Sequence, residues 1–167
     1  MRLFIAINFN EDTRAQLVFM RDELRSLSNR GNFSATENLH LTLAFLGECD
    51  AKQAAAAKSA MDAVAFEPFP LKIERAGRFR RNGSDLWWAG VQASKPLLAL
   101  HGDLTDKLIA AGFALEKRKY SPHVTLGREI DTDAAPWTVE PFGETVMKIE
   151  LMKSERINGK LTYTAIY

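Results

Sequence analysis

A four-residue pattern, histidine–apolar–threonine–leucine, occurs once in each half of this chain and constrains its fold more than any other feature. The copies span residues 40–43 (HLTL) and 123–126 (HVTL), and each is soon followed by a glycine. Both lie in segments that we predict to be β-strands, where alternate side chains share a face. Each copy therefore places a histidine beside a threonine on one face. By the same alternation, we expect Leu41, Leu43 and Phe45 to point the other way.

The paired residues indicate a specific chemistry. If the two halves of the chain pair about a pseudo-twofold axis, His40, Thr42, His123 and Thr125 line one groove. Imidazole titrates near neutrality, so one histidine can take a proton from water while the other gives one to a leaving oxygen. The threonine hydroxyls can donate hydrogen bonds to non-bridging phosphate oxygens as charge builds up. We therefore predict acid–base cleavage of a phosphodiester.

Periodicity and capping residues predict the rest of the secondary structure. We expect strands over 2–9, near Phe33, and over 39–46, 71–79, 86–93 and 122–128, with a final antiparallel pair over 144–155 and 161–167. Helices should follow the caps Asn10, Asp50 and Ser94, with Leu27 on the first helical face and Val64 on the second. Asn-Gly pairs at 82–83 and 158–159 predict hairpin turns. The pattern is α+β, and 167 residues suit one domain spanning 1–167.

Charge and composition exclude several classes of protein. A net charge of +1 argues against a protein that coats long nucleic acid, although a short or terminal phosphate remains open. Basic clusters at 75–81 and 117–119 are typical of solvated surface. No apolar stretch approaches the roughly 20 residues that cross a bilayer, so we expect no membrane contact. Cys49 is the only cysteine, which permits no internal disulfide and fits a cytoplasmic setting.

Other candidate residues carry weaker signals. Neither motif has the accompanying carboxylate or thiolate that a metal site needs, so we predict no metal. Trp87 and Trp88 face opposite sides of one strand, and one of them could stack on a base near a groove. Phe79 could do the same, although a hairpin phenylalanine is more often in the core. His101 lies in line with a helical apolar face, and we expect it to be packed or half-buried.

The chain resembles the two-histidine phosphoesterases and, within them, the bacterial and archaeal RNA 2′,3′-cyclic phosphodiesterases, also called 2′-5′ RNA ligase-like proteins. The resemblance rests on the extended motifs at 40–47 (HLTLAFLG) and 121–128 (SPHVTLGR), and on segments 2–7, 77–88 and 153–163. It implies two lobes, each with an antiparallel sheet and flanking helices. It also implies cleavage of the 3′ ester of a terminal 2′,3′-cyclic phosphate, leaving a 2′-phosphate, without metal or nucleotide cofactor. By the same resemblance His40 is the proton donor, His123 the acceptor, and Arg128 a ligand of the phosphate.

Several functions stay open at this point. The same residues could act on a small cyclic nucleotide or on a cyclic phosphate of ADP-ribose, or could join tRNA halves through a 2′-5′ bond. A non-catalytic module that binds RNA ends is a different class, and the intact histidines and threonines argue against it. We expect the partner to be RNA with a cyclic-phosphate end or a small cyclic nucleotide, and the protein to be a monomer.

Overall fold

The computed structural model describes residues 1–82, 84–116 and 118–167. Within these ranges the chain forms three α-helices, one short 3₁₀ helix and nine strands. In chain order the elements are β1 (Arg2–Asn8), α1 (Glu11–Ser26), β2 (Ser28–Phe33), η1 (Thr36–Asn38), β3 (His40–Glu48), α2 (Ala51–Ala63), β4 (Phe69–Phe79), β5 (Asp85–Val91), α3 (Lys95–Ala110), β6 (His123–Thr132), β7 (Trp137–Val146), β8 (Glu150–Ile157) and β9 (Lys160–Ala165).

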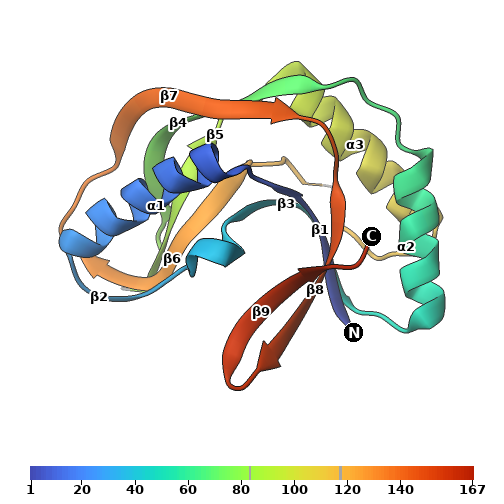
Figure 1. The fold of residues 1–167 in the computed structure, drawn as a ribbon, viewed down its shortest axis with the longest axis horizontal. Helices are drawn as coiled ribbons and strands as arrows, with labels where there is room; N and C mark the ends of the chain where they lie inside the picture. The colour runs from blue at the N-terminus through green and yellow to red at the C-terminus, as the bar shows by residue number, and fades with distance from the viewer. Residues whose placement is uncertain (83, 117) are drawn as a thin grey trace.

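The strands form two antiparallel sheets, one in each lobe. The four-stranded sheet has the order β3-β1-β8-β9 and the five-stranded sheet the order β2-β6-β5-β4-β7. Figure 1 shows the β8–β9 hairpin projecting from the four-stranded sheet, with α1 lying over the five-stranded sheet and α2 beside α3. The predicted α+β fold with an antiparallel sheet in each lobe is confirmed. The lobes are not the two halves of the chain, because strands from both ends build the four-stranded sheet.

The two sheets are topologically equivalent around the motif strands. Without β2, their orders become β3-β1-β8-β9 and β6-β5-β4-β7. Each motif strand pairs antiparallel with a strand that lies one helix earlier in the chain, β1 before α1 and β5 before α3. The registers correspond as well, since His40 is opposite Asn8 and His123 is opposite Gly90. This equivalence supports the predicted pseudo-twofold relation of the lobes.

Local sequence explains where the helices begin. The side chains of Asn10 and Asp50 accept hydrogen bonds from backbone N–H groups at 2.9 and 2.8 Å, and Asp50 forms a capping box with Gln53. Ser94 caps α3, whose first turn carries Pro96. Leu27 is an exception to the predicted apolar face: it follows the last residue of α1 and is 52% exposed. Val64 likewise lies just past the end of α2, but it packs against the core.

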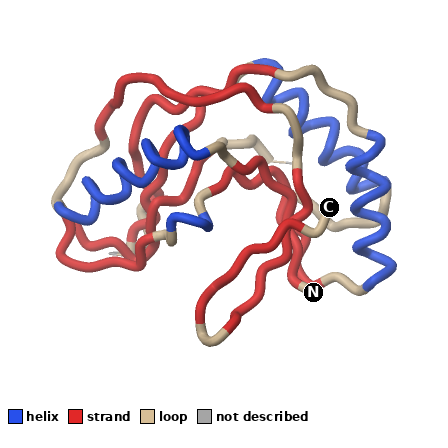
Figure 2. The backbone as a smooth tube through the Cα atoms, in the orientation of Figure 1, coloured by secondary structure: helices blue, strands red, loops and turns tan. Residues whose placement is uncertain are grey.

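The motif strands separate a large core from the interlobe space. Leu41, Leu43, Val124 and Leu126 are all at most 4% exposed and belong to the main hydrophobic core. The opposite face of the four-stranded sheet carries a small cluster in which Phe4, Ala6 and Met152 pack with Tyr163. Figure 2 shows this sheet facing the strands of the other lobe across the concave side of the molecule. The apolar residues of the motifs thus anchor both strands in the core, and the histidines and threonines between them lie on the opposite face of each strand.

The prediction of one strand over 144–155 is wrong. Residues 137–146 form β7, which pairs with β4 in the five-stranded sheet, and a break separates it from β8 in the other sheet. The sequence did not predict this strand because it contains Pro141 and Gly143, two residue types that disfavour strand interiors. The structure tolerates Pro141 because β7 is the edge strand of its sheet, where one side of the backbone needs no partner.

The second predicted hairpin is confirmed and the first is only partly described. Asn158 and Gly159 join β8 to β9 with φ values of 52° and 77°, which suit the mirror-image turns of two-residue hairpins. Strands β4 and β5 also pair antiparallel as expected. The predicted Asn-Gly turn between them includes Gly83, which lies outside the described residues, as does Lys117 of the second basic cluster.

Candidate active site

The structure brings all five predicted site residues to one groove between the lobes. His40 and Thr42 reach it from β3, and His123, Thr125 and Arg128 reach it from β6. The groove has a volume of about 810 Å³, and both sheets contribute to its walls. A groove of this size can enclose a small organic ligand such as a nucleotide.

Both imidazoles are held by a backbone carbonyl two residues earlier in the chain. Nδ1 of His40 lies 2.7 Å from the Asn38 carbonyl oxygen, and Nδ1 of His123 lies 2.7 Å from that of Ser121. A carbonyl only accepts hydrogen bonds, so Nδ1 carries a proton in both rings. Nε2 is therefore the atom that gains or loses a proton near neutrality. In His40 this atom is 2.8 Å from Oγ1 of Thr42.

Burial and charge set the protonation of the two histidines. Burial lowers the pKa of His40, the Asn38 carbonyl partly opposes this, and Arg128 and His123 lower it further. Burial also lowers the pKa of His123, with the Ser121 carbonyl opposing and Arg128 adding to the effect. An anion bound in the groove would favour the protonated form of either ring. A bound phosphate would therefore raise the pKa of both imidazoles and favour their protonation.

Each motif strand contains a bulge directly after its threonine. Thr42 is opposite Ala6 and Ala44 is opposite Ile5, so Leu43 has no partner in β1. Thr125 is opposite Trp88 and Gly127 is opposite Trp87, so Leu126 has no partner in β5. An extra residue on one strand reverses the alternation of side chains beyond it.

These bulges explain how Phe45 and Arg128 come to line the groove. Each lies five residues after its histidine, a spacing that would put it on the opposite face of a regular strand. The expectation that Phe45 points away from His40 and Thr42 is therefore wrong: Phe45 is 51% exposed and lines the groove with them. At the equivalent position in β6, the bulge brings a guanidinium to the groove.

Two reciprocal hydrogen bonds link the segment before each motif to the threonine of the other motif, and the Tyr120 bond crosses between the lobes. Oγ of Ser34, six residues before His40, donates to the Thr125 carbonyl at 2.8 Å. The hydroxyl of Tyr120, three residues before His123, donates to the Thr42 carbonyl at 2.8 Å. Each segment that leads into one motif therefore holds the threonine of the other. Sequence reasoning missed both residues, because no local pattern indicates a contact across so many intervening residues.

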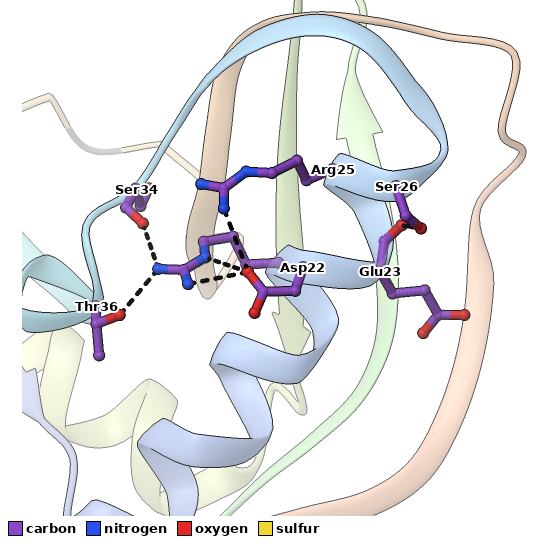
Figure 3. A network of polar contacts seen from close by, with 7 residues as sticks. Asp22, Glu23, Arg25, Ser26, Ser34 and Thr36 are labelled. Carbon is purple, nitrogen blue, oxygen red and sulfur yellow. Dashed lines mark hydrogen bonds and ion pairs between the residues drawn. The ribbon is translucent and has the colours of Figure 1, made fainter.

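A buried arginine supports the segment that leads to His40. Arg21, only 8% exposed, donates to the Ser34 carbonyl at 2.9 Å and to Oγ1 of Thr36 at 3.0 Å, and it also contacts Asp22. Figure 3 shows these contacts between α1 and the chain that leads into the 3₁₀ helix. That short helix ends at Asn38, whose carbonyl orients His40. Helix α1 thereby helps to fix the position of the first imidazole.

Further polar and aromatic side chains complete the groove, and the sequence analysis did not single them out. They include Arg2 and Phe4 of β1, Arg156 of β8, and Lys160 and Tyr163 of β9. The Phe4 and Tyr163 rings lie 4.8 and 5.3 Å from the His40 ring, measured between centroids. The sequence contains no local signal for these residues beyond their place in strands, since only the sheet order brings β1, β8 and β9 beside β3.

The weaker candidates have mixed outcomes. Both tryptophans are buried and neither lines the groove, and the Trp88 ring fills the space above Gly77, where a Cβ would lie 2.4 Å from it. Phe79 packs edge-on against His123, with centroids 5.2 Å apart. His101 is half-buried, as expected, but its ring stacks on that of Tyr120 at 3.8 Å.

Neither a metal cluster nor a membrane span is found where the structure describes the chain. Among residues 1–82, 84–116 and 118–167, no group of three or more His, Cys, Asp or Glu side chains could hold a metal ion. No helix within the same ranges is long and apolar enough to cross a membrane.

Comparison with known proteins identifies the family. The chain is 30% identical over 169 residues to the RNA 2′,3′-cyclic phosphodiesterase of Archaeoglobus fulgidus, covering 96% of this chain and 94% of that protein. It is 30% identical to the protein of the same name from Escherichia coli, covering 99% and 93%. The crystal structure of E. coli LigT complexed with 3′-AMP matches with a TM-score of 0.85 at 27% identity, covering 99% of this chain and 95% of that one. The family model of the 2′-5′ RNA ligase superfamily matches residues 14–157, and the chain therefore belongs to this superfamily.

Proposed function

We propose that this protein hydrolyses the terminal 2′,3′-cyclic phosphate of RNA to a 2′-phosphomonoester by histidine acid–base catalysis, without a metal ion. The observation that carries the proposal is that the two imidazoles are oriented in the same way and line the same groove. Both are fixed through Nδ1 by a backbone carbonyl, and both line one groove with two threonines and an arginine. The names of the relatives from A. fulgidus and E. coli supply the substrate class.

The proposed reaction assigns one role to each group. Nε2 of His123 takes a proton from water, the water oxygen attacks phosphorus, and the bond from phosphorus to the 3′ oxygen breaks. Protonated Nε2 of His40 gives its proton to the departing 3′ oxygen, so the products are a 2′-phosphate and a free 3′-hydroxyl. Thr42 and Thr125 donate hydrogen bonds to the non-bridging oxygens, and the Arg128 guanidinium stabilises their charge. The product state leaves His40 neutral and His123 protonated, and proton exchange with water restores both.

The test uses a 5′-labelled oligonucleotide that ends in a 2′,3′-cyclic phosphate. We expect the wild-type protein to convert it to the 2′-phosphate, with unchanged kcat after treatment with EDTA and desalting. His40→Gln and His123→Gln should each lower kcat by about 10²- to 10⁴-fold, the usual contribution of general acid–base catalysis. Formation of a 3′-phosphate would contradict the proposed bond cleavage. Loss of activity on chelation, with recovery on adding zinc or magnesium, would contradict the metal-free mechanism.

The same assay separates the alternative functions. Turnover of a cyclic phosphate of ADP-ribose but not of the oligonucleotide would indicate a small-molecule enzyme. Joining of the cyclic end to an added 5′-hydroxyl RNA would indicate that the reverse, ligating direction is available to the same groups. Binding of the cyclic end without any conversion would leave a non-catalytic end-binding module. A single-domain monomer in the cytoplasm stays our prediction for the state of the protein.

A further inference from the structure

We propose that a second groove, next to the candidate active site, binds the RNA nucleotides on the 5′ side of the terminal cyclic phosphate. This inference rests on the proposed function and adds a binding site to it. Thr42, Phe45 and His123 line both grooves, so the second begins where the reacting phosphate would lie. Its volume is about 670 Å³, which is room for about one or two nucleotides.

The charge of the second groove suits a phosphate backbone. Arg81, Arg118 and Lys119 line it, and Glu116 is the only carboxylate among its described lining residues. Glu116 lies 3.6 Å from Arg118, but the two side chains are 80% and 84% exposed, so water screens this pair. In the part of the chain that the structure describes, the side chains of Arg81 and Lys119 form no ion pair. Both remain available for phosphate oxygens.

Cations of the first groove beyond Arg128 are already engaged. Lys160 is paired with Glu37 at 2.8 Å, and Arg156 donates to the Gly159 carbonyl at 3.1 Å. The Arg2 guanidinium lies over the Phe45 ring, 4.9 Å from its centroid. A strand that followed the β8–β9 hairpin would compete with these contacts at a small cost, because water screens the exposed Lys160–Glu37 pair too. The path through the second groove has no such cost at Arg81 and Lys119.

Aromatic rings lie along the same path. Phe45, at the junction of the two grooves, is 51% exposed. The parallel rings of His101 and Tyr120, 3.8 Å apart with an interplanar angle of 1°, form a rigid part of the wall, and Phe79 lines it too. Aromatic faces and basic side chains along one groove bind single strands with little preference for sequence. The second groove should therefore recognise chain length rather than base identity.

The test compares adenosine 2′,3′-cyclic phosphate with a pentanucleotide that ends in the same cyclic nucleotide. The wild-type protein should have a KM for the pentanucleotide about tenfold or more below that for the mononucleotide. The double variant Arg81→Ala, Lys119→Ala should raise the pentanucleotide KM about 5- to 30-fold and leave kcat/KM for the mononucleotide unchanged. In the double variant, the negative slope of log kcat/KM against log salt concentration for the pentanucleotide should become less steep by about 1.4, since each lost phosphate contact with a single strand contributes about 0.7.

Three control variants sharpen the result. Lys52→Ala, Lys95→Ala removes the same charge from exposed positions in α2 and α3 that line neither groove, and its KM values should match the wild type. Arg81→Lys, Lys119→Arg retains charge in the groove and should retain the low pentanucleotide KM, which assigns the effect of the alanine variant to the lost charge. Arg156→Ala, Lys160→Ala should leave the ratio of the two KM values in place.

Four results would overturn the inference or the proposal beneath it. Equal wild-type KM values for the two substrates, or an unchanged pentanucleotide KM in Arg81→Ala, Lys119→Ala, would refute the second groove and leave the proposed function standing. Loss of the length preference in Arg156→Ala, Lys160→Ala alone would place the strand along the β8–β9 hairpin. Wild-type protein that converts neither substrate would refute the proposed function itself.

Discussion

Tyr120→Phe removes one hydrogen bond between the lobes and keeps the aromatic ring. The lost hydroxyl donates to the Thr42 carbonyl at 2.8 Å, and burial raises the pKa of Tyr120, so the group is a donor throughout the neutral range. The ring can still stack on His101. Losing such a bond costs about 1–2 kcal/mol of unfolding free energy, which lowers Tm by about 2–8 °C in a chain of this size.

The loss of stability alone cannot change turnover at 25 °C. A domain that starts with at least about 5 kcal/mol of unfolding free energy stays more than about 99% folded after losing 2 kcal/mol. If Tyr120 positions Thr42 and His123 relative to each other, however, a displacement of about 1 Å between them can cost about 100-fold in rate. We therefore expect kcat on the cyclic-phosphate oligonucleotide to fall about 10- to 100-fold, with KM changed much less.

The matched control is Tyr167→Phe, which removes a tyrosine hydroxyl bonded to Asp62 at 2.6 Å, outside both grooves. It should leave kcat unchanged whatever it does to Tm. Both variants are compared by thermal unfolding and by steady-state kinetics at 25 °C. Wild-type kcat in a folded Tyr120→Phe protein would show that the hydroxyl only stabilises the fold, and the positioning role would be abandoned.

Four further predictions concern the groups in the groove. Thr42→Val and Thr125→Val keep the shape of the side chain and remove the donor, so kcat should fall about 10- to 1,000-fold in each; wild-type turnover in a folded double variant would exclude both hydroxyls from the reaction. Because burial lowers the pKa of both His40 and His123, the bell-shaped profile of kcat/KM should be centred on the acid side of neutrality. Arg128 lowers both pKa values, so Arg128→Gln should move both limbs to higher pH, whereas Arg156→Gln should not; a shift to lower pH would contradict the electrostatic account. An aryl phosphodiester whose phenolate leaves unaided should rescue His40→Ala but not His123→Ala, and rescue of His123→Ala instead would exchange the two roles.

Much of the fold could be predicted from sequence because its signals are local. The caps of the three helices are set by side chains that bond backbone groups three residues away, so Asn10, Asp50 and Ser94 were visible directly. Strand β7 was not visible, because Pro141 and Gly143 oppose strand formation except at the edge of a sheet. Whether a segment becomes an edge strand depends on its neighbours in space, which a local pattern does not contain.

The residues of the candidate site also fall into two groups, those that local sequence predicts and those that it does not. That His40 shares a face with Thr42 and His123 with Thr125 follows from the sequence alone, because alternation within a strand is a local property of the backbone. Which other side chains join them depends on contacts between segments that are distant in the sequence. Bulges against β1 and β5 turn Phe45 and Arg128 into the groove, and the order of the sheets brings β8 and β9 beside β3. Bulges and sheet order arise from pairing between distant segments. The hydrogen bond of Ser34 to Thr125 likewise depends on the pairing of β2 with β6, and that of Tyr120 to Thr42 forms only once both lobes are in place.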